Sequence, residues 1–281
     1  EMCIRDRSFG GFTLLRYLST YPESLSAGYF TGGLSAVGRS ADDIYAACYE
    51  QLRAKSLEYY KRFPGDRVRF AELAALAKKG EIATPSGDVV CPSRLRSLGH
   101  VLGASGGAEK LHYLLEYPHT SRAFRHDLAE LLPYDGRNPL YAVIHESSYA
   151  DGVVTDWSAA RTLPDDFRED PTLLTGEHVM PEWFDTDQEL RPWKEVADLI
   201  ANHPWPKLYD PDVLRTAEVP CAAAVYHDDA YVPRKFSLET AALLPQMHAW
   251  VTTEYEHNGS NASGGAVLDR LIKLAKGEIV R

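Results

Sequence analysis

A serine followed at once by two glycines and an apolar helical pattern restricts the fold of this chain more than any other stretch. The stretch is Ser8-Phe9-Gly10-Gly11-Phe12, and a helical spacing of apolar residues continues to about residue 21. Small neighbours allow a serine to sit on a sharp strand-to-helix turn, where the backbone is strained and the helix packs close to the strand. The pattern predicts a nucleophile elbow, normally Gly-x-Ser-x-Gly, although Asp6 stands at the position of the leading glycine.

The residues before Ser8 do not resemble the central strand that precedes an elbow. Most of residues 1–7 are charged or polar, among them Arg5, Asp6 and Arg7. We therefore predict that residues 1–7 form no strand and are foreign to the rest of the chain, and that the chain is an N-terminally truncated fragment.

Alternation of strands and helices is confined to the two ends of the chain. Near the start, residues 25–31 read as a buried parallel strand that ends in Gly32-Gly33. Near the end, the continuous apolar run 221–226 is typical of a strand buried on both faces. We expect a helix over 236–244, a strand over 248–255 and a helix over 265–276.

The middle of the chain has helical spacing without such alternation. We expect helices over 40–63, 68–79, 107–116, 121–132, 138–149 and 190–202, and a hairpin over 81–90. The fold class is therefore α/β, with a sheet core at residues 8–38 and 216–281 and a large, mainly helical insertion at residues 39–215.

Charge and composition exclude several classes of protein. The net charge is −10 and no long basic run exists, which argues against nucleic acid as a partner. No apolar stretch is long enough for a transmembrane helix. The four cysteines lack CxxC spacing, which favours a reducing compartment, and a cytoplasmic location is the default expectation. Neither an HExxH pair nor a glycine-rich nucleotide loop is present, so we expect no metal and no cofactor.

Three side chains could carry acyl-transfer chemistry, which needs a nucleophile, a base and a carboxylate that orients the base. Ser8 lies at the elbow, Asp228-Asp229 follows the strand predicted at 221–226, and His257 follows the next strand. The order Ser, Asp, His is that of α/β-hydrolases. Taken singly, the serine could be a plain turn, the aspartates a helix cap, and the histidine a solvated loop residue.

The chain from Ser8 onward resembles the proline iminopeptidases, serine peptidases of the α/β-hydrolase fold. The resemblance rests on the elbow, on Thr31-Gly32-Gly33-Leu34, on Asp229-Ala-Tyr-Val-Pro233 and on two segments similar to the larger-cap members, residues 138–146 and 174–177. It implies that Ser8 is the nucleophile, His257 the base and Asp229 its orienting acid, with Asp228 as the alternative. It also implies that the backbone N–H of Phe9 is an oxyanion donor.

The same resemblance implies release of an N-terminal proline from a peptide. Glu146 and Glu177 match cap glutamates that bind the free amine, and Tyr149, Trp183 and Phe184 could form walls for the pyrrolidine ring. Without the resemblance, each glutamate would be taken as a surface or capping residue and each aromatic residue as core.

Two alternatives remain open at this point. The same triad could serve an esterase or another α/β-hydrolase that acts on a neutral substrate. The chain could also be an inert fragment or scaffold, because it lacks the His-Gly-Gly type of loop that supplies the second oxyanion donor upstream of the elbow. The sequence leaves the oligomeric state open.

Overall fold

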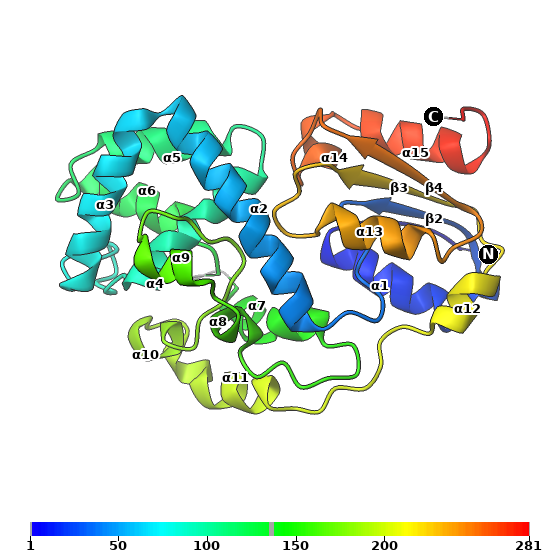
Figure 1. The fold of residues 1–281 in the computed structure, drawn as a ribbon, viewed down its shortest axis with the longest axis horizontal. Helices are drawn as coiled ribbons and strands as arrows, with labels where there is room; N and C mark the ends of the chain where they lie inside the picture. The colour runs from blue at the N-terminus through cyan, green and yellow to red at the C-terminus, as the bar shows by residue number, and fades with distance from the viewer. Residues whose placement is uncertain (1, 135–137, 281) are drawn as a thin grey trace. The chain divides into compact units, whose positions relative to one another are not determined.

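Two compact units make up the chain (Figure 1). The computed structural model describes residues 2–134 and 138–280. The sheet unit consists of Glu1–Ser40, Ser148–Val153 and Trp205–Arg281. The helical unit consists of Ala41–Ser147 and Val154–Pro204.

A four-stranded parallel sheet organises the sheet unit. Its strands are β1 (Met2–Arg7), β2 (Leu25–Thr31), β3 (Cys221–Tyr226) and β4 (Met247–Thr252), in the spatial order β1-β2-β3-β4. Every residue of β3 is buried, which confirms the expectation for this apolar run. Because β2 and β3 are neighbours, the two distant ends of the chain close one sheet.

The expectation that residues 1–7 form no strand is wrong. β1 pairs in parallel with β2, with Asp6 opposite Phe30 and Arg7 opposite Thr31. Among the described strands β1 lies at one edge of the sheet, where charged side chains can reach water while the backbone still pairs. Arg7 is accordingly exposed. A charged composition therefore does not exclude a parallel strand.

Helices cover both faces of the sheet (Figure 1). On one face, α1 (Phe9–Leu18) and α12 (Pro211–Thr216) share an apolar cluster with β2 and β3, and α13 (Arg234–Ala241) packs against β3 and β4. On the other face, α15 (Ala266–Ala275) packs on Tyr29, Ala222 and Tyr226. A short α14 (Gly259–Ala262) precedes α15, and a 3₁₀ turn η1 (Pro22–Ser24) precedes β2. The result is a three-layer α/β/α arrangement with a parallel sheet.

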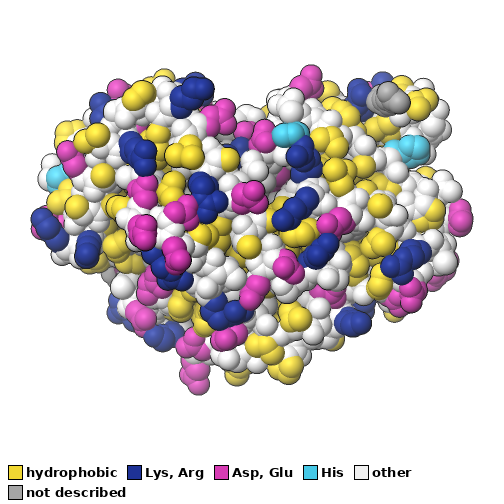
Figure 2. Space-filling view, viewed as in Figure 1, with side chains coloured by type: hydrophobic (Ala, Val, Ile, Leu, Met, Phe, Trp, Pro, Cys, Tyr) yellow, Lys and Arg dark blue, Asp and Glu magenta, His cyan; other side chains and the backbone are white. Residues whose placement is uncertain are grey.

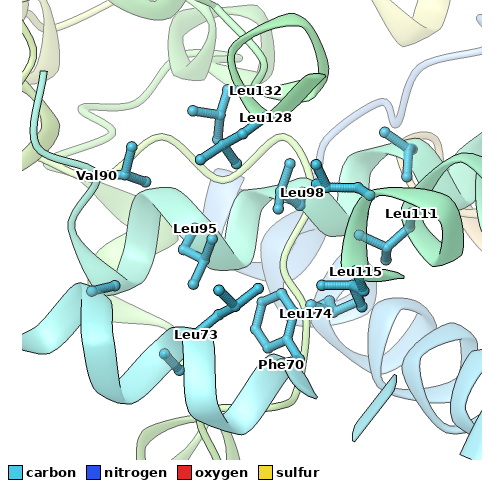
Figure 3. Packing of buried hydrophobic residues seen from close by; sticks show 14 of the residues in the cluster. Phe70, Leu73, Val90, Leu95, Leu98, Leu111, Leu115, Leu128, Leu132 and Leu174 are labelled. Carbon is cyan, nitrogen blue, oxygen red and sulfur yellow. The ribbon is translucent and has the colours of Figure 1, made fainter. Parts of the chain in front are cut away.

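The helical unit has its own core of leucine and aromatic side chains. Phe70, Leu95 and Leu128 belong to this core and are completely buried (Figure 3). Its longer helices are α2 (Ala41–Arg62), α3 (Pro64–Lys78), α5 (Gly107–Glu116), α6 (Arg122–Leu131) and α11 (Lys194–Ala201). Its shorter helices are α4 (Pro92–Arg96), α7 (Pro139–Ile144), α8 (Ser158–Arg161), α9 (Asp165–Glu169) and α10 (Trp183–Thr186). The 3₁₀ segments are η2 (Ser97–Gly103), η3 (Glu146–Tyr149), which continues into the sheet unit, and η4 (Arg191–Trp193).

Three details differ from the sequence expectations. α3 begins at Pro64, four residues before the expected start, because proline is favoured in the first turn of a helix. Residues 81–90 contain a single antiparallel bridge, Ala83 to Val89, in place of a hairpin. The helix expected over 138–149 ends at Ile144 and is followed by the 3₁₀ segment η3.

Charges of both signs are interspersed on the face drawn in Figure 2. The mixture agrees with a chain whose acidic residues outnumber its basic ones without a basic run. Within the described residues, no helix is both long and apolar enough to cross a bilayer.

Candidate active site

Ser8 occupies a strained turn between β1 and α1. Its φ of 53° and ψ of −126° lie in a region that residues with a side chain rarely adopt. The turn is held by two backbone hydrogen bonds: the Ser8 N–H donates to the Thr31 carbonyl at 3.2 Å, and the Ser8 carbonyl accepts from the Gly11 N–H at 2.8 Å. Strain at a half-buried serine on a strand-to-helix turn is the geometry of a nucleophile elbow.

Close backbone packing explains the glycines of the elbow. A Cβ on Gly11 would overlap the backbone of Gly33, in the turn after β2. A Cβ on Gly10 would overlap the side chain of Asp6. Asp6 therefore occupies the space beside Gly10 that the glycine of the usual motif leaves open.

Asp229 lies in the loop that follows β3 and is 3% exposed. Its Oδ1 accepts the backbone N–H groups of Tyr231 at 2.9 Å and Val232 at 3.0 Å. Its Oδ2 lies 2.7 Å from Nδ1 of His257. Because a carboxylate only accepts, Nδ1 of the neutral imidazole carries the proton and Nε2 is the basic nitrogen. Asp228 is instead exposed and pairs with its neighbour His227 at 2.7 Å.

His257 follows β4 and lies against the turn that ends β2. Nδ1 of His257 is 3.1 Å from the position that a Cβ on Gly32 would take. The backbone of Ser8 bonds to Thr31 in the same turn. The ring of Tyr231 meets the imidazole edge-on, with 4.8 Å between centroids. The sheet unit thus brings Ser8, Asp229 and His257 to the carboxyl ends of β1, β3 and β4.

Phe9, for which the family resemblance implies an oxyanion donor, follows Ser8 at the start of α1. Phe9 is the first residue of α1, so its N–H has no acceptor within the helix. It directly follows Ser8, and the positive end of the helix favours negative charge there.

Glu146 is held by backbone donors within the helical unit. Its two carboxylate oxygens accept the N–H groups of Ser158 at 2.9 Å and Ala159 at 3.1 Å. These groups open α8, and the preceding Asp156 and Trp157 both have positive φ, which turns the N–H groups toward the carboxylate. Glu146 therefore caps α8, the alternative that the sequence had left open for it.

Glu177 lies in the loop before α10, and its side chain is 26% exposed. Its Oε2 is 3.3 Å from Nε2 of His145. His145 immediately precedes Glu146, so both candidate glutamates are anchored near the end of α7.

Of the three aromatic candidates, Tyr149 lies in the sheet unit, whereas Trp183 and Phe184 lie in the helical unit. Tyr149 belongs to the sheet unit, contacts the ring of Phe12 at 5.9 Å and donates its hydroxyl hydrogen to the Tyr231 carbonyl at 3.4 Å. Trp183 is fully buried in the helical unit, where its indole N–H donates to Ser93 at 3.0 Å. Arg94 stacks over the same indole. These contacts assign Trp183 to core packing, as they do its buried neighbour Phe184, which packs against the ring of Trp157.

Sequence reasoning missed the side chains that hold the glutamates. Tyr45 and the backbone amides of α8 carry no motif, and His145 lies in the segment 138–146 without a role assigned to it. The available signal was a histidine next to each glutamate, in His145-Glu146 and in Glu177-His178. Among the described residues, no group of three His, Cys, Asp or Glu side chains could hold a metal ion.

Comparison with known proteins agrees with this geometry. The fold is α/β with a parallel sheet, and a strained serine and an Asp–His pair lie at the carboxyl ends of its strands. No family model matches the chain. A proline iminopeptidase of Aeromonas sobria is 39% identical over an alignment that covers 95% of this chain and 65% of that protein. A second proline iminopeptidase, of Aspergillus aculeatus, is 25% identical over 97% of this chain and 63% of its own length.

The chain is a homologue of the proline iminopeptidases, which confirms the resemblance inferred from its motifs. Such homologues imply an α/β-hydrolase fold. The chain spans slightly less than two thirds of the length of these relatives.

Proposed function

We propose that the protein is a serine aminopeptidase that releases N-terminal proline from peptides through an acyl-enzyme. The observation that carries the proposal is the 2.7 Å hydrogen bond between Asp229 and His257 in the same unit as the strained Ser8. Homology to two proline iminopeptidases supports the choice of substrate.

The triad would act in two halves. Oγ of Ser8 attacks the carbonyl carbon of the N-terminal proline, and Nε2 of His257 takes the hydroxyl proton. The tetrahedral intermediate collapses when His257 gives that proton to the leaving amine, which leaves a prolyl ester on Ser8. Water then attacks the ester with His257 again as base, and His257 returns that proton to Oγ of Ser8 as the ester bond breaks and proline is released. Asp229 keeps Nδ1 protonated and stabilises the imidazolium in each half.

Charge on the reacting carbonyl oxygen needs N–H donors. The Phe9 N–H is the donor that we assign from this chain, and such a donor contributes about 2.7–4 kcal/mol to transition-state stabilisation.

Recognition of the free amine needs carboxylates. A protonated proline nitrogen loses water when it binds, and negative charge with acceptor oxygens offsets that loss. We assign this role to Glu177 and Glu146, with Tyr149 as a wall for the ring. Glu177 is the stronger candidate, because both oxygens of Glu146 already accept backbone N–H groups.

We further propose that the helical unit corresponds to the cap of the larger-cap members, since it interrupts the sheet unit in the chain. The cytoplasmic location stays a prediction, based on cysteines without CxxC spacing.

Hydrolysis of proline 4-nitroanilide tests the proposal. We expect turnover of this substrate, no turnover of the N-acetylated form, and a loss of kcat on the order of 10³-fold or more in Ser8→Ala. Ser24→Ala, in the η1 turn, is the matched control and should keep the parental rate. An unchanged rate in Ser8→Ala would refute the mechanism. Equal turnover of the acetylated substrate would favour an esterase-like hydrolase that ignores the amine.

A further inference from the structure

The carboxylate of Glu177 is held by a buried histidine that takes no part in the proposed acyl transfer. Nε2 of His145 lies 3.3 Å from Oε2 of Glu177. His145 is 2% exposed and follows the last residue of α7. The rings of Tyr134 and Tyr141 lie against the imidazole, each with 5.4 Å between centroids. The imidazole therefore has little freedom to turn.

Glu177 fixes which nitrogen of His145 carries the proton, and Tyr45 can bond to the other nitrogen. The hydroxyl oxygen of Tyr45 is 3.4 Å from Nδ1 of His145. Glu177 accepts at Nε2, so the Nε2–H tautomer is the one that satisfies both contacts, with Nδ1 accepting from the tyrosine O–H. The hydrogen bonds thus run in one direction, from Tyr45 through His145 to Glu177.

The backbone of Glu177 is fixed from the other side by His178. Nδ1 of His178 accepts the N–H of Gly176 at 3.3 Å. The His178 ring packs on Tyr49 at 4.2 Å and on Tyr45 at 5.3 Å between centroids. Both the loop and the carboxylate of Glu177 are therefore anchored to α2.

We propose that His145 is a positioning residue that orients the Glu177 carboxylate for the amine of the substrate. The inference rests on the proposed function of the site. A free glutamate side chain must lose rotamer freedom when it binds an ammonium group, and a preformed hydrogen bond removes part of that loss beforehand. The N–H of His145 uses one of about four lone-pair directions of a carboxylate, so this bond does not by itself prevent the carboxylate from accepting a hydrogen bond from an amine.

Kinetics of two substitutions at position 145 test the proposal. Gln can place its side-chain N–H near the position of Nε2, whereas Leu keeps bulk without a donor. On proline 4-nitroanilide we expect His145→Leu to raise KM about tenfold, since a hydrogen bond to a charged group is lost, with a smaller effect on kcat. His145→Gln should return KM to within about threefold of the parent.

His126→Leu provides the matched control. His126 is an exposed residue of α6 in the same unit. Its removal should leave KM unchanged. The proposal is overturned if His145→Leu leaves KM at the parental value. It is also overturned if KM of His145→Gln is as high as KM of His145→Leu.

A measurement without turnover separates this inference from the proposed function. Nitrogen-15 spectra of the histidine side chains should show His145 as the Nε2–H tautomer, with a resonance that shifts in Glu177→Gln. A protein that shows this signature but does not hydrolyse proline 4-nitroanilide would refute the function and leave the pair intact. An Nδ1–H tautomer at His145 would refute the positioning role.

Discussion

At the scale of single residues, the hydrogen bond between Asp229 and His257 carries the account. Two adjacent aspartates follow β3, and their spacing alone does not separate them. Burial and partners separate them: Asp229 accepts two backbone N–H groups and the imidazole, whereas Asp228 is exposed beside His227. Only the buried carboxylate can hold His257 in the tautomer that leaves Nε2 basic.

Exchange of each aspartate for asparagine should therefore affect kcat very differently. We expect Asp229→Asn to lower kcat by about 10³–10⁴-fold, because an amide no longer fixes the Nδ1–H tautomer. Asp228→Asn makes the same exchange one residue away. It should change kcat by less than about threefold, because the ion pair of Asp228 with His227 is exposed and contributes little to stability. Steady-state assays on proline 4-nitroanilide measure both. Equal losses in the two variants would contradict the assignment.

The two elbow glycines should also respond differently to a methyl group. In Gly11→Ala the new Cβ would meet the backbone of Gly33, which cannot move without disturbing the turn after β2. In Gly10→Ala it would meet the side chain of Asp6, whose carboxylate can rotate away. We expect Gly11→Ala to lower the free energy of unfolding by about 1–3 kcal/mol more than Gly10→Ala does.

Urea denaturation followed by circular dichroism measures the difference between these glycine variants. Asp6→Ala combined with Gly10→Ala is the control, and it should recover most of the loss seen in Gly10→Ala. If the two single variants are equally stable, Gly11 is not in close contact with Gly33.

At the scale of elements, sequence pattern predicts the buried strands and long helices well. The apolar run 221–226 and the segment 25–31 form strands within the expected bounds. β1 was missed because the prediction used only the propensity and charge of its side chains. The strand is instead defined by backbone pairing with β2, which does not depend on side-chain charge. The short helices α4, α8, α9 and α10 have four or five residues each, too few for a helical period to be visible.

The candidate site, too, could be predicted from the sequence only in part. The order Ser8, Asp229, His257 could be predicted because each follows or precedes a recognisable element. The partners of Glu146 could not, because Asp156 and Trp157 adopt positive φ without glycine. Their strained turn depends on tertiary contacts such as that of Trp157 with Phe184.

The loop that carries Glu177 should be sensitive to acid through His178. Burial lowers the pKa of His178 from 6.5 to about 3. The unfolded chain therefore binds a proton at this site that the folded chain does not bind as the pH falls from 6.5 toward 3. Stability present above pH 6.5 is lost in that window, at up to about 1.4 kcal/mol per pH unit.

Denaturation curves at several pH values test this sensitivity. His178→Gln removes the titrating group, and its free energy of unfolding should fall less steeply between pH 6.5 and 4.5 than that of the parent. Gln can still accept the N–H of Gly176, which makes it the conservative choice. Parallel pH profiles for the two proteins would show that His178 is not a source of acid sensitivity.

At the scale of the whole molecule, two units with separate cores make up the chain. The core of the helical unit gathers leucines such as Leu95 and Leu128. The sheet unit has apolar clusters on both faces of its sheet, and Leu271 of α15 belongs to one of them. Separate cores predict that a cavity in one unit is felt first within that unit.

Leu128→Ala should lower the stability of the helical unit by about 2–5 kcal/mol, because the removed methyl groups leave a cavity in a closely packed core. Hydrogen exchange followed by mass spectrometry should show faster exchange in residues 41–147 with little change in β3. Leu271→Ala is the counterpart in the sheet unit and should give the reverse pattern. Equal acceleration everywhere in both variants would mean that the chain unfolds as one unit.

The central claim is that Ser8 is an activated nucleophile. Treatment with a fluorophosphonate, followed by peptide mapping, tests this claim directly, because the reagent bonds to a serine whose hydroxyl is deprotonated by a neighbouring base. We predict one adduct, on Ser8, that forms much more slowly in Asp229→Asn and at the parental rate in Asp228→Asn. An adduct on another serine, or none on the folded protein, would contradict the account.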